Sequence, residues 1–243
     1  MINSSLNPHI SVVTVVYNGF NSIEKTIRSV LEQTVFSDVE YILIEGGSTD
    51  ETMDIIRKYV DQIDILVSEK DRGIYDAMNK AIRLAHGRWI CFMNAGDTFY
   101  SNYTLESLHL DSIEADKIIY GDCVLVTEKG NITKKAHPFF NEKSELKGIG
   151  ICHQAIYTPT QWLKCRPFKG EQFHYCADFE FLYYCWEQGY HFEYRPQPLC
   201  YYEYGNGVSS TQRHYRNILI ENATIIKKKR SWAYYKEMVK SYF

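Results

Sequence analysis

The segment GRWICFMNAGDTFY, residues 87–100, combines an apolar run with a polar turn. Residues 89–93 form an apolar run typical of a buried strand, and they lead into a polar turn that holds Asn94 and Asp97. Ligands of open parallel sheets bind beyond the carboxyl ends of the strands. An acid in such a turn therefore suits a hydrated divalent cation and the phosphates that the cation binds. The same residues also fit an ordinary turn in which Asp97 caps the following segment.

Three earlier segments repeat the order strand, turn and helix. Residues 10–16, 40–45 and 64–69 are short apolar runs, and each is followed by a glycine-containing turn and by apolar residues at helical spacing. Short connections of this kind predict an α/β fold with a mostly parallel central sheet and helices on both faces. Right-handed crossovers place all of the strand-to-helix turns at one edge of that sheet. The turns expected to meet there are residues 17–19, 45–48, 71–73 and 94–97.

Local signals indicate where these helices begin and end. Asn21 with Glu24, and Ser48 with Glu51, have the spacing of capping boxes. The helix after Ser48 is expected to run to about residue 60. Gly87 is expected to close the helix that precedes residues 89–93.

After about residue 100 the alternation of strands and helices is lost. Residues 117–127 and 131–137 flank a Glu-Lys-Gly turn and predict a hairpin. Residues 176–189 predict a helix that carries Asp178 at its start and ends at a glycine. The remaining expected elements are a strand over 153–158, two strands at 191–195 and 199–204 on either side of Pro196 and Pro198, a flexible loop at 205–207 and a helix over about 211–230.

Composition bounds the class of protein. A chain of 243 residues can bury one sizeable core, and a net charge of −3 gives no reason to expect nucleic acid as a partner. The seven cysteines form no C-x-x-C pair and lie mostly in apolar runs, which is typical of reduced, buried thiols. We find no cleavable signal pattern and no window near the ~18 apolar residues that span a bilayer, so a cytoplasmic location is expected.

Taken together, four segments resemble the family 2 glycosyltransferases, especially the bacterial subgroup that builds capsule and exopolysaccharide sugars. They are SVVTVVYNGFNSIEKTIRSVLEQT, EYILIEGGSTDETMDII, GIYDAMNKAI and GRWICFMNAGDTF, and the similarity covers roughly residues 10–210. The resemblance implies a GT-A (Rossmann-like) fold, a nucleotide-sugar donor, a divalent cation and an inverting mechanism. It also implies a transferase domain over 1–210, with a nucleotide-binding half at about 8–100 and an acceptor half at about 101–210, followed by a C-terminal helical extension over 211–243.

By position, the resemblance implies several contacts with the nucleotide. Thr14 and Tyr17 fall near the end of the first strand, where the family contacts the nucleoside. Glu45 stands where the family usually has an aspartate that accepts a hydrogen bond from uracil, and glutamate is one methylene longer. Asp71 and Arg72 match a polar turn that lines the nucleotide, where a cationic side chain suits a diphosphate.

The resemblance also implies a metal ligand in the turn after residue 93. Many family members have Asp-x-Asp-Asp there, whereas this chain has Asn-Ala-Gly-Asp and keeps only the last acid. Asp97 is therefore the expected ligand of Mn²⁺ or Mg²⁺, and Asn94 is an expected donor contact. One carboxylate, two phosphate oxygens and waters are sufficient to hold such an ion.

Asp178 matches the catalytic base of the family. Inversion requires a carboxylate near the acceptor hydroxyl, opposite the leaving diphosphate, to take the proton as the oxygen attacks. A helix N-terminus favours the ionised form of Asp178, which suits a base. The structural alternative is a simple capping role, and Glu180 is the nearest rival for the base.

Three further positions have two interpretations each. His153 and Gln154 fall where the family places a strand beside the donor sugar and the acceptor, but a lone histidine also commonly has a structural role. Asp76 either caps its helix or contacts the donor sugar. Residues 205–209 resemble a loop that closes over the donor, and taken alone they have the composition of a mobile linker.

The C-terminal segment combines Lys227, Lys228, Lys229 and Arg230 with aromatic residues. A basic and aromatic helix can lie on an anionic bilayer, where each cation contributes about 1 kcal/mol. Peripheral membrane contact of this kind would suit a lipid-linked acceptor. A solvated or dimer-forming helix is the equal alternative.

The sequence therefore predicts an inverting glycosyltransferase. It would move a sugar from a nucleoside diphosphate, expected to be UDP, to a saccharide or lipid-linked saccharide acceptor in surface polysaccharide assembly. A sugar-phosphate nucleotidyltransferase would need a basic Gly-rich phosphate loop after the first strand, which YNGFNSIEK matches poorly. A non-catalytic nucleotide-binding scaffold is the third interpretation, and the reduced metal motif favours it slightly.

Overall fold

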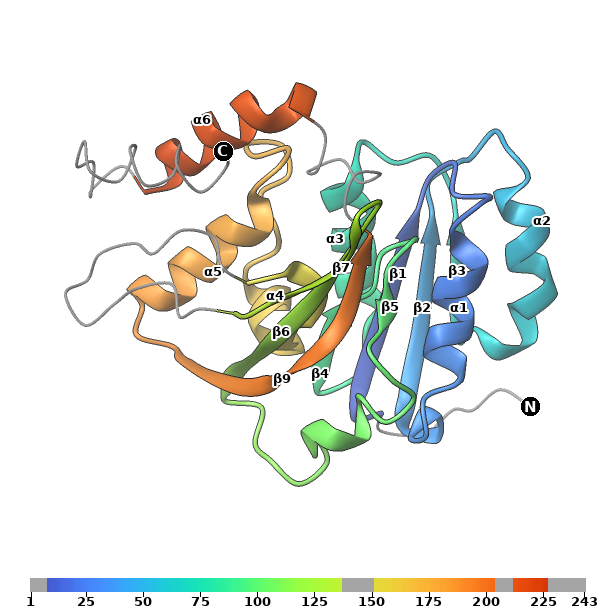
Figure 1. The fold of residues 1–243 in the computed structure, drawn as a ribbon, viewed down its shortest axis with the longest axis horizontal. Helices are drawn as coiled ribbons and strands as arrows, with labels where there is room; N and C mark the ends of the chain where they lie inside the picture. Colours follow the sequence, from blue (N-terminus) through green and yellow to red (C-terminus); the bar gives the residue numbers. More distant parts are fainter. Residues whose placement is uncertain (1–7, 137–150, 204–211, 227–243) are drawn as a thin grey trace.

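The structure of the protein, a computed structural model, describes residues 8–136, 151–203 and 212–226. The strands of these residues form one nine-stranded sheet in the order β3-β2-β1-β4-β8-β6-β9-β5, with β7 paired to β6 outside this path (Figure 1). The predicted α/β class is confirmed. The parallel arrangement holds for the first four strands, whereas the other strands form a mixed sheet.

The first half of the chain consists of the predicted strand–helix units. Its parallel strands are β1 (Ile10–Val16), β2 (Val39–Glu45), β3 (Ile65–Ser68) and β4 (Trp89–Phe92). Its α-helices are α1 (Ile23–Leu31), α2 (Thr52–Ile56) and α3 (Ile74–Leu84). Short 3-10 helices, η1 (Phe36–Asp38) and η2 (Arg57–Gln62), precede β2 and β3.

The second half adds a more mixed set of elements. Its strands are β5 (Thr98–Phe99), β6 (Lys117–Thr127), β7 (Gly130–Lys134), β8 (Ile156–Pro159) and β9 (His191–Glu203). Its helices are η3 (Glu106–Leu108), η4 (His153–Ala155), α4 (Thr160–Cys165), α5 (Ala177–Glu187) and α6 (Gln212–Ile225). The hairpin predicted around residues 128–130 is confirmed by the antiparallel pairing of β6 and β7.

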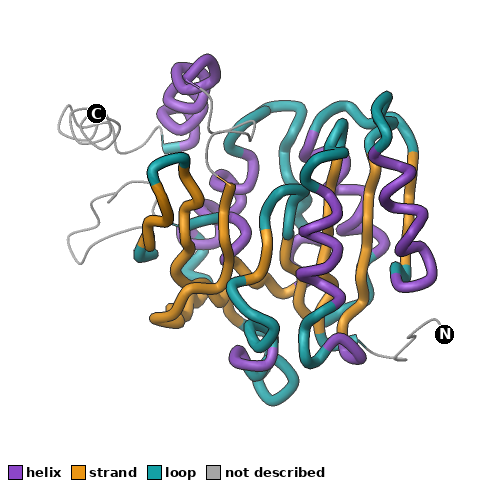
Figure 2. Tube along the Cα trace, turned by 45° about the vertical axis from the view of Figure 1, so that its right-hand side comes forward, coloured by secondary structure: helices purple, strands orange, loops and turns teal. Residues whose placement is uncertain are grey.

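Two apolar clusters hold the layers together. Alternate side chains of a strand point to opposite faces, so Val13 of β1 joins the cluster that contains α3 and α5, whereas Val12 joins the cluster that contains α1 and α2. Ile218 of α6 and Ile226, which directly follows that helix, belong to the first of these clusters. Figure 2 shows the strands (orange) as a layer with helices (purple) packed along it.

The predicted capping boxes are wrong. Helix α1 begins after Ser22 and α2 begins after Glu51, and neither of these N-cap residues makes a side-chain capping hydrogen bond. Asn21 and Ser48 therefore do not cap helices. Ser48 Oγ instead accepts a hydrogen bond from the backbone N–H of Asn18 at 2.8 Å, because the two turns lie against each other. The helix expected as far as residue 60 is α-helical only to Ile56 and continues as η2.

Gly87 does not close α3, which has Ala85 at its C-cap. A Cβ atom on Gly87 would overlap the backbone nitrogen of Ser11 in β1. The N–H of Gly87 also donates to Ser11 Oγ at 2.9 Å. The glycine is therefore required for the close approach of two backbones where β4 enters the sheet.

The two strands expected around Pro196 and Pro198 are one strand, β9. Its pairing with β6 shifts register around Asp122, which accommodates the prolines in a bulge. His153 and Gln154 lie in η4, not in the predicted strand, which begins at Ile156. Residues 205–209 and the basic segment 227–230 lie outside the described residues.

All seven cysteines are free, as expected, and five of them are buried. Cys165 is exposed and Cys152 is half-buried, so the expectation of buried thiols is wrong for these two. Across the described ranges, no helix combines the length and the apolar character needed to cross a bilayer.

Candidate active site

The strand-to-helix turns of the first half meet at one edge of the sheet, at the top of Figure 1, and this confirms the predicted convergence. We call residues 17–19, 45–48, 71–73 and 94–97 the rim. Asn18 N–H donates to Ser48 Oγ at 2.8 Å, which joins the turns after β1 and β2. Ala95 N–H donates to the carbonyl of Val15 at 3.3 Å, which brings the turn after β4 onto the end of β1.

Tyr17, Gly46 and Asp71 come together from three of these turns. A Cβ atom on Gly46 would overlap Asp71 Oδ2 and would lie 3.5 Å from Tyr17 Cβ. The absent side chain of Gly46 thus leaves the space that Asp71 occupies. Tyr17 is 60% exposed, and Asp71 is half-buried with its Oδ1 accepting from Gly73 N–H at 2.9 Å. An aromatic ring and a carboxylate therefore stand together on the rim, where a ligand can reach them.

Glu45 and Thr14, which were both predicted to contact the nucleotide, are buried in this structure. The carboxylate of Glu45 accepts from Ser48 N–H at 2.5 Å and from the hydroxyl of Ser68 at 2.6 Å. Burial raises the pKa of Glu45, but these hydrogen bonds outweigh it and hold the pKa below its usual value. The hydroxyl of Thr14 donates to the carbonyl of Met93 at 2.9 Å. Both side chains thus fix the rim from within, and their contact with the nucleotide stays a prediction.

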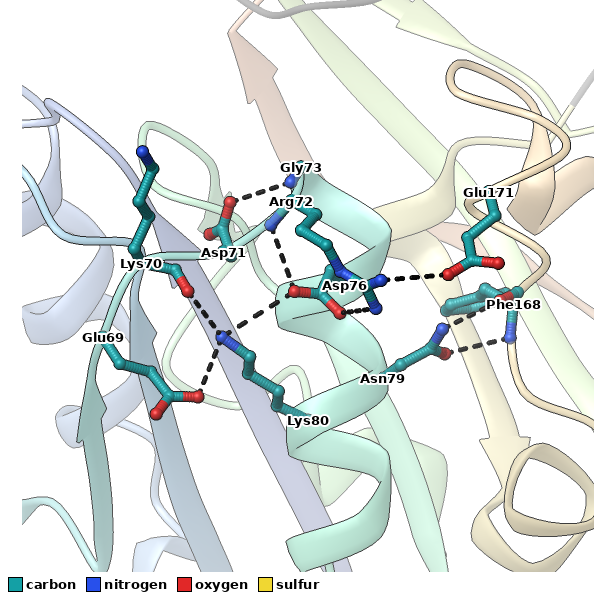
Figure 3. Close-up of polar contacts among 10 residues, drawn as sticks. All are labelled: Glu69, Lys70, Asp71, Arg72, Gly73, Asp76, Asn79, Lys80, Phe168 and Glu171. Carbon is teal, nitrogen blue, oxygen red and sulfur yellow. Dashed lines mark hydrogen bonds and ion pairs between the residues drawn. The ribbon is translucent and has the colours of Figure 1, made fainter.

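Arg72 and Asp76 belong to a polar cluster at the start of α3 (Figure 3). The carboxylate of Asp76 accepts from the backbone N–H of Arg72 at 3.1 Å and from its guanidinium at 3.2 Å. Lys80 lies 3.8 Å from Asp76 and 2.9 Å from Glu69. Asp76 therefore satisfies a backbone donor at the helix start, in line with its capping alternative. The side chain of Arg72 is 76% exposed and also contacts Glu171 at 3.1 Å, so its cationic group stays accessible to an anion.

Asp97 lies in the turn after β4, but its carboxylate faces inward. The residue is 4% exposed. Its Oδ2 accepts from Gln154 Nε2 at 2.5 Å and its Oδ1 accepts from Glu203 N–H at 2.9 Å. Burial raises the pKa of Asp97 to about 7, although both hydrogen bonds act in the opposite direction.

The described residues do not fit a divalent cation in this arrangement. Both oxygens of Asp97 are bound to protein donors, and the described part of the chain has no group of three or more His, Cys, Asp or Glu side chains suited to a metal. The carboxylate of Glu203 lies 2.9 Å from where a Cβ on Gly96 would stand, and it pairs with Lys25 at 2.7 Å. Asn94 Oδ1 is buried and has no hydrogen-bond partner among the described residues. The arrangement gives no support to Asp97 as the carboxylate that holds the ion.

Asp178 lies in the first turn of α5 and is contacted from two sides. Tyr75 donates its hydroxyl hydrogen to Oδ1 at 2.6 Å, and His153 Nδ1 lies 3.2 Å from Oδ2. Burial raises the pKa of Asp178, but the contacts with His153 and Tyr75 outweigh it, so the pKa lies below its usual value. The carboxylate is therefore ionised at neutral pH. Its side chain is 25% exposed, so a hydroxyl group of a ligand can reach it.

His153 and Gln154 connect the two predicted acids. These residues are consecutive in η4, and His153 contacts Asp178 while Gln154 donates to Asp97. The ring of His153 packs on Phe92 with the centroids 5.1 Å apart. Asp97 and Asp178 are thus linked through one dipeptide and lie in the same region of the molecule.

Glu180, the sequence-based rival of Asp178, is occupied elsewhere. Its carboxylate accepts two hydrogen bonds from Arg166, at 2.6 and 2.9 Å, and one from Lys169 at 3.1 Å. Sequence reasoning missed Tyr75, whose partner Asp178 is 103 positions away. The only signal for Tyr75 was its place in the segment GIYDAMNKAI, at the start of a helix that follows the rim.

A family model described as Glycosyl transferase family 2 matches residues 11–179. The match covers more than half of the chain, so this chain belongs to glycosyl transferase family 2. It includes the rim, η4 and the first residues of α5 with Asp178.

Curated relatives carry related names. The chain is 31% identical over 155 residues to a PGL/p-HBAD biosynthesis glycosyltransferase of Mycobacterium bovis. This match covers 62% of this chain and 59% of the relative. It is 28% identical over 156 residues to an uncharacterized glycosyltransferase of Rickettsia prowazekii, covering 62% and 48% of the two chains. The matched part thus spans about half to six-tenths of the length of these relatives.

Solved structures share the fold. A mannosyltransferase of Pyrobaculum calidifontis, in complex with GDP-Man and Mn²⁺, matches with a TM-score of 0.68 and 19% identity over 97% of this chain and 69% of that chain. TarS of S. aureus (residues 1–349), in complex with UDP-GlcNAc, matches with a TM-score of 0.66 and 17% identity over 95% and 70%. The predicted GT-A architecture is confirmed.

Proposed function

We propose that the protein is an inverting glycosyltransferase that moves a sugar from a nucleoside-diphosphate donor to a saccharide or lipid-linked saccharide acceptor in surface polysaccharide assembly. The observation that carries the proposal is the placement of an ionised, partly exposed carboxylate, Asp178, beside the rim of a family 2 fold. His153 contacts Asp178 and Gln154 contacts Asp97, so this dipeptide connects Asp178 to the rim.

In this proposal the rim binds the donor. The exposed ring of Tyr17 is suited to packing on a nucleobase, and the exposed guanidinium of Arg72 is suited to the diphosphate. Because Glu45 is already bound to Ser48 and Ser68, it acts by holding the rim in shape. UDP is the proposed nucleotide, although the two solved neighbours bind UDP-GlcNAc and GDP-Man respectively, so both nucleotides belong in the test.

Asp178 acts as the general base of the proposed reaction. It takes the proton of the acceptor hydroxyl as that oxygen attacks the anomeric carbon, and the nucleoside diphosphate leaves from the opposite face with the bonding electrons. Tyr75 and His153 hold the carboxylate in place and keep it ionised. A single displacement of this kind inverts the configuration at the anomeric carbon.

A divalent cation has no step in this mechanism, because the described residues do not fit one as arranged. The solved mannosyltransferase neighbour holds Mn²⁺, which makes the dependence of this protein on Mn²⁺ or Mg²⁺ worth measuring directly. UDP release with Mn²⁺, with Mg²⁺ and with a chelator would answer the question.

The test compares wild type with Asp178→Asn and with Glu180→Gln, a matched carboxylate on the same helix. The assay follows UDP or GDP release from UDP-N-acetylglucosamine, UDP-glucose, UDP-galactose and GDP-mannose in the presence of a panel of aryl glycosides. Loss of a general base lowers rates by about 10²- to 10⁴-fold, so Asp178→Asn should lose turnover to that extent while UDP affinity stays nearly unchanged. Glu180→Gln should retain most of the rate, because its carboxylate is bound to Arg166.

Equal rates for Asp178→Asn and wild type would refute the assignment of the base. Absence of turnover with any nucleotide sugar, together with intact UDP binding, would favour the non-catalytic scaffold. Pyrophosphate release from a nucleoside triphosphate and a sugar phosphate would indicate a nucleotidyltransferase.

A further inference from the structure

Glu221 of α6 binds the backbone segment that immediately precedes α5. Its carboxylate accepts hydrogen bonds from the N–H groups of His174 at 2.9 Å, Tyr175 at 2.9 Å and Cys176 at 3.0 Å. One side chain thus satisfies three consecutive backbone donors. Glu221 lies outside residues 11–179, which the family model matches.

These contacts supply what α5 lacks locally. Cys176 is the N-cap residue of α5, and its own side chain makes no capping hydrogen bond. Backbone donors at a helix start have no partner within the helix, and the N-terminal end of the helix dipole attracts negative charge. The carboxylate of Glu221 accepts from the N–H of the N-cap residue Cys176 and from the two residues before it, and it brings a negative charge to this end of the helix. Hydrogen bonds to an ionised acceptor are about twice as strong as neutral ones.

A second contact holds α6 and the same segment together. The hydroxyl of Tyr175 lies 2.8 Å from His214 Nδ1, and the two rings pack with centroids 5.1 Å apart. Ile218 of α6 and Ile226, the residue that follows the helix, are buried in the cluster that contains α5. Figure 1 shows α6 (red) lying beside the start of α5. The position of residues 174–176 therefore depends on the docking of α6.

Asp178 follows this segment by two residues, and the backbone between them is fixed from both sides. Tyr175 donates its N–H to Glu221, and its carbonyl oxygen lies 3.0 Å from the hydroxyl of Tyr75. The same hydroxyl lies 2.6 Å from Asp178 Oδ1. A shift of residues 174–176 would therefore move the carboxylate of Asp178 relative to Tyr75 and His153.

We propose that Glu221 is a positioning residue for Asp178, so that sugar transfer requires α6 to be docked on the start of α5. The proposal rests on the proposed function, in which Asp178 is the general base. It assigns α6 a role in turnover that is separate from binding the donor, because the contacts of Glu221 are to residues 174–176 and not to the rim.

The experiment uses the full chain and compares wild type, Glu221→Gln, Glu221→Ala and the control Asn217→Ala, an exposed position one turn earlier on α6. Glutamine keeps the side-chain length but loses the charge and replaces one acceptor oxygen with a donor. Hydrogen exchange of the amides of residues 174–176 is measured first, since it reports the contacts whether or not the protein is an enzyme. The kcat and the KM for the donor are then measured in the UDP-release assay.

We expect exchange at 174–176 to be at least about tenfold faster in both Glu221 variants, with α3 unaffected. Misplacing a reacting group by about 1 Å can cost about a hundredfold in rate, so kcat should fall about ten- to a hundredfold in Glu221→Ala and less in Glu221→Gln. The donor KM should stay within about twofold, and Asn217→Ala should match wild type. If Glu221→Ala does not fold, Glu221→Gln alone carries the test.

Faster exchange with an unchanged kcat would overturn the positioning role and leave Glu221 as a purely structural cap. Unchanged exchange in Glu221→Gln and Glu221→Ala would overturn the contact itself. If wild type turns over no nucleotide sugar while exchange responds as expected, the proposed function fails and the role in turnover falls with it.

Discussion

The two halves of the molecule place their polar side chains by different means. In the first half, Glu45 finds its partners Ser48 and Ser68 in its own turn and in the next strand. In the second half, Asp178 is contacted by Tyr75, which is 103 positions away, and the segment before it is held by Glu221 of the last described helix. Contacts between neighbouring strand–helix units thus build most of the surface proposed to bind the donor. Long-range contacts hold the carboxylate proposed as the base and the segment before it.

Helix α3 belongs to both halves. It follows the rim, yet Asn79 makes two hydrogen bonds with the backbone of Phe168, at 2.8 and 3.0 Å (Figure 3). Tyr75 reaches Asp178 and Arg72 reaches Glu171 from the same region. Helix α3 of the first half therefore positions the start of α5.

The largest expected effect is on the stability of the sheet in the first half. Gly87→Ala would place a Cβ against the backbone nitrogen of Ser11, which has little room to move within β1. We expect the free energy of unfolding to fall by about 3 kcal/mol or more, measured by urea denaturation. Gly130→Ala is the control, because no atom lies within 4 Å of its Cβ position and only its positive φ of 115° carries a cost, of about 1–2 kcal/mol. If Gly87→Ala is as stable as this control, the backbone of β1 can move to make room for the Cβ, and the expected clash is wrong.

A smaller effect is expected on the rim alone. Gly46→Ala would displace Asp71 and disturb the approach of Tyr17, since its Cβ would overlap Asp71 Oδ2. UDP affinity should weaken about tenfold, equivalent to 1.4 kcal/mol, when measured by titration calorimetry. Thermal stability should change little, because Asp71 is half-buried and can rotate. If UDP affinity is unchanged while turnover falls, the rim does not act through donor binding, and the proposed separation of donor binding from chemistry is wrong.

The smallest and most specific effect is expected at Tyr75. Burial raises the pKa of Asp178, the contacts with His153 lower it, and the hydrogen bond from Tyr75 lowers it further. With the folded-state pKa depressed, the active ionised base is lost only as pH falls through that low value. Tyr75→Phe removes one lowering contact, so the acid limb of kcat/KM should move to higher pH while UDP affinity stays constant.

Tyr59→Phe provides the matched control for that experiment. The hydroxyl of Tyr59 donates to Glu24 in α1 and has no contact with Asp178. Its acid limb should coincide with that of wild type. A shift of equal size in both variants would mean that the profile reports general destabilisation and not the ionisation of Asp178.

The strand–helix units, the common edge of their turns and the family could be predicted from the residues alone. These follow from apolar periodicity and turn residues, which act over a few positions along the chain. The folded chain was needed to show that Glu45 and Asp97 are bound inside the protein, that His153 and Gln154 join two acids, and that Glu221 holds the start of α5. These contacts could not be predicted, because the exposure and ionisation of a carboxylate depend on donors that packing brings to it, and those donors lie up to 106 positions away in this chain.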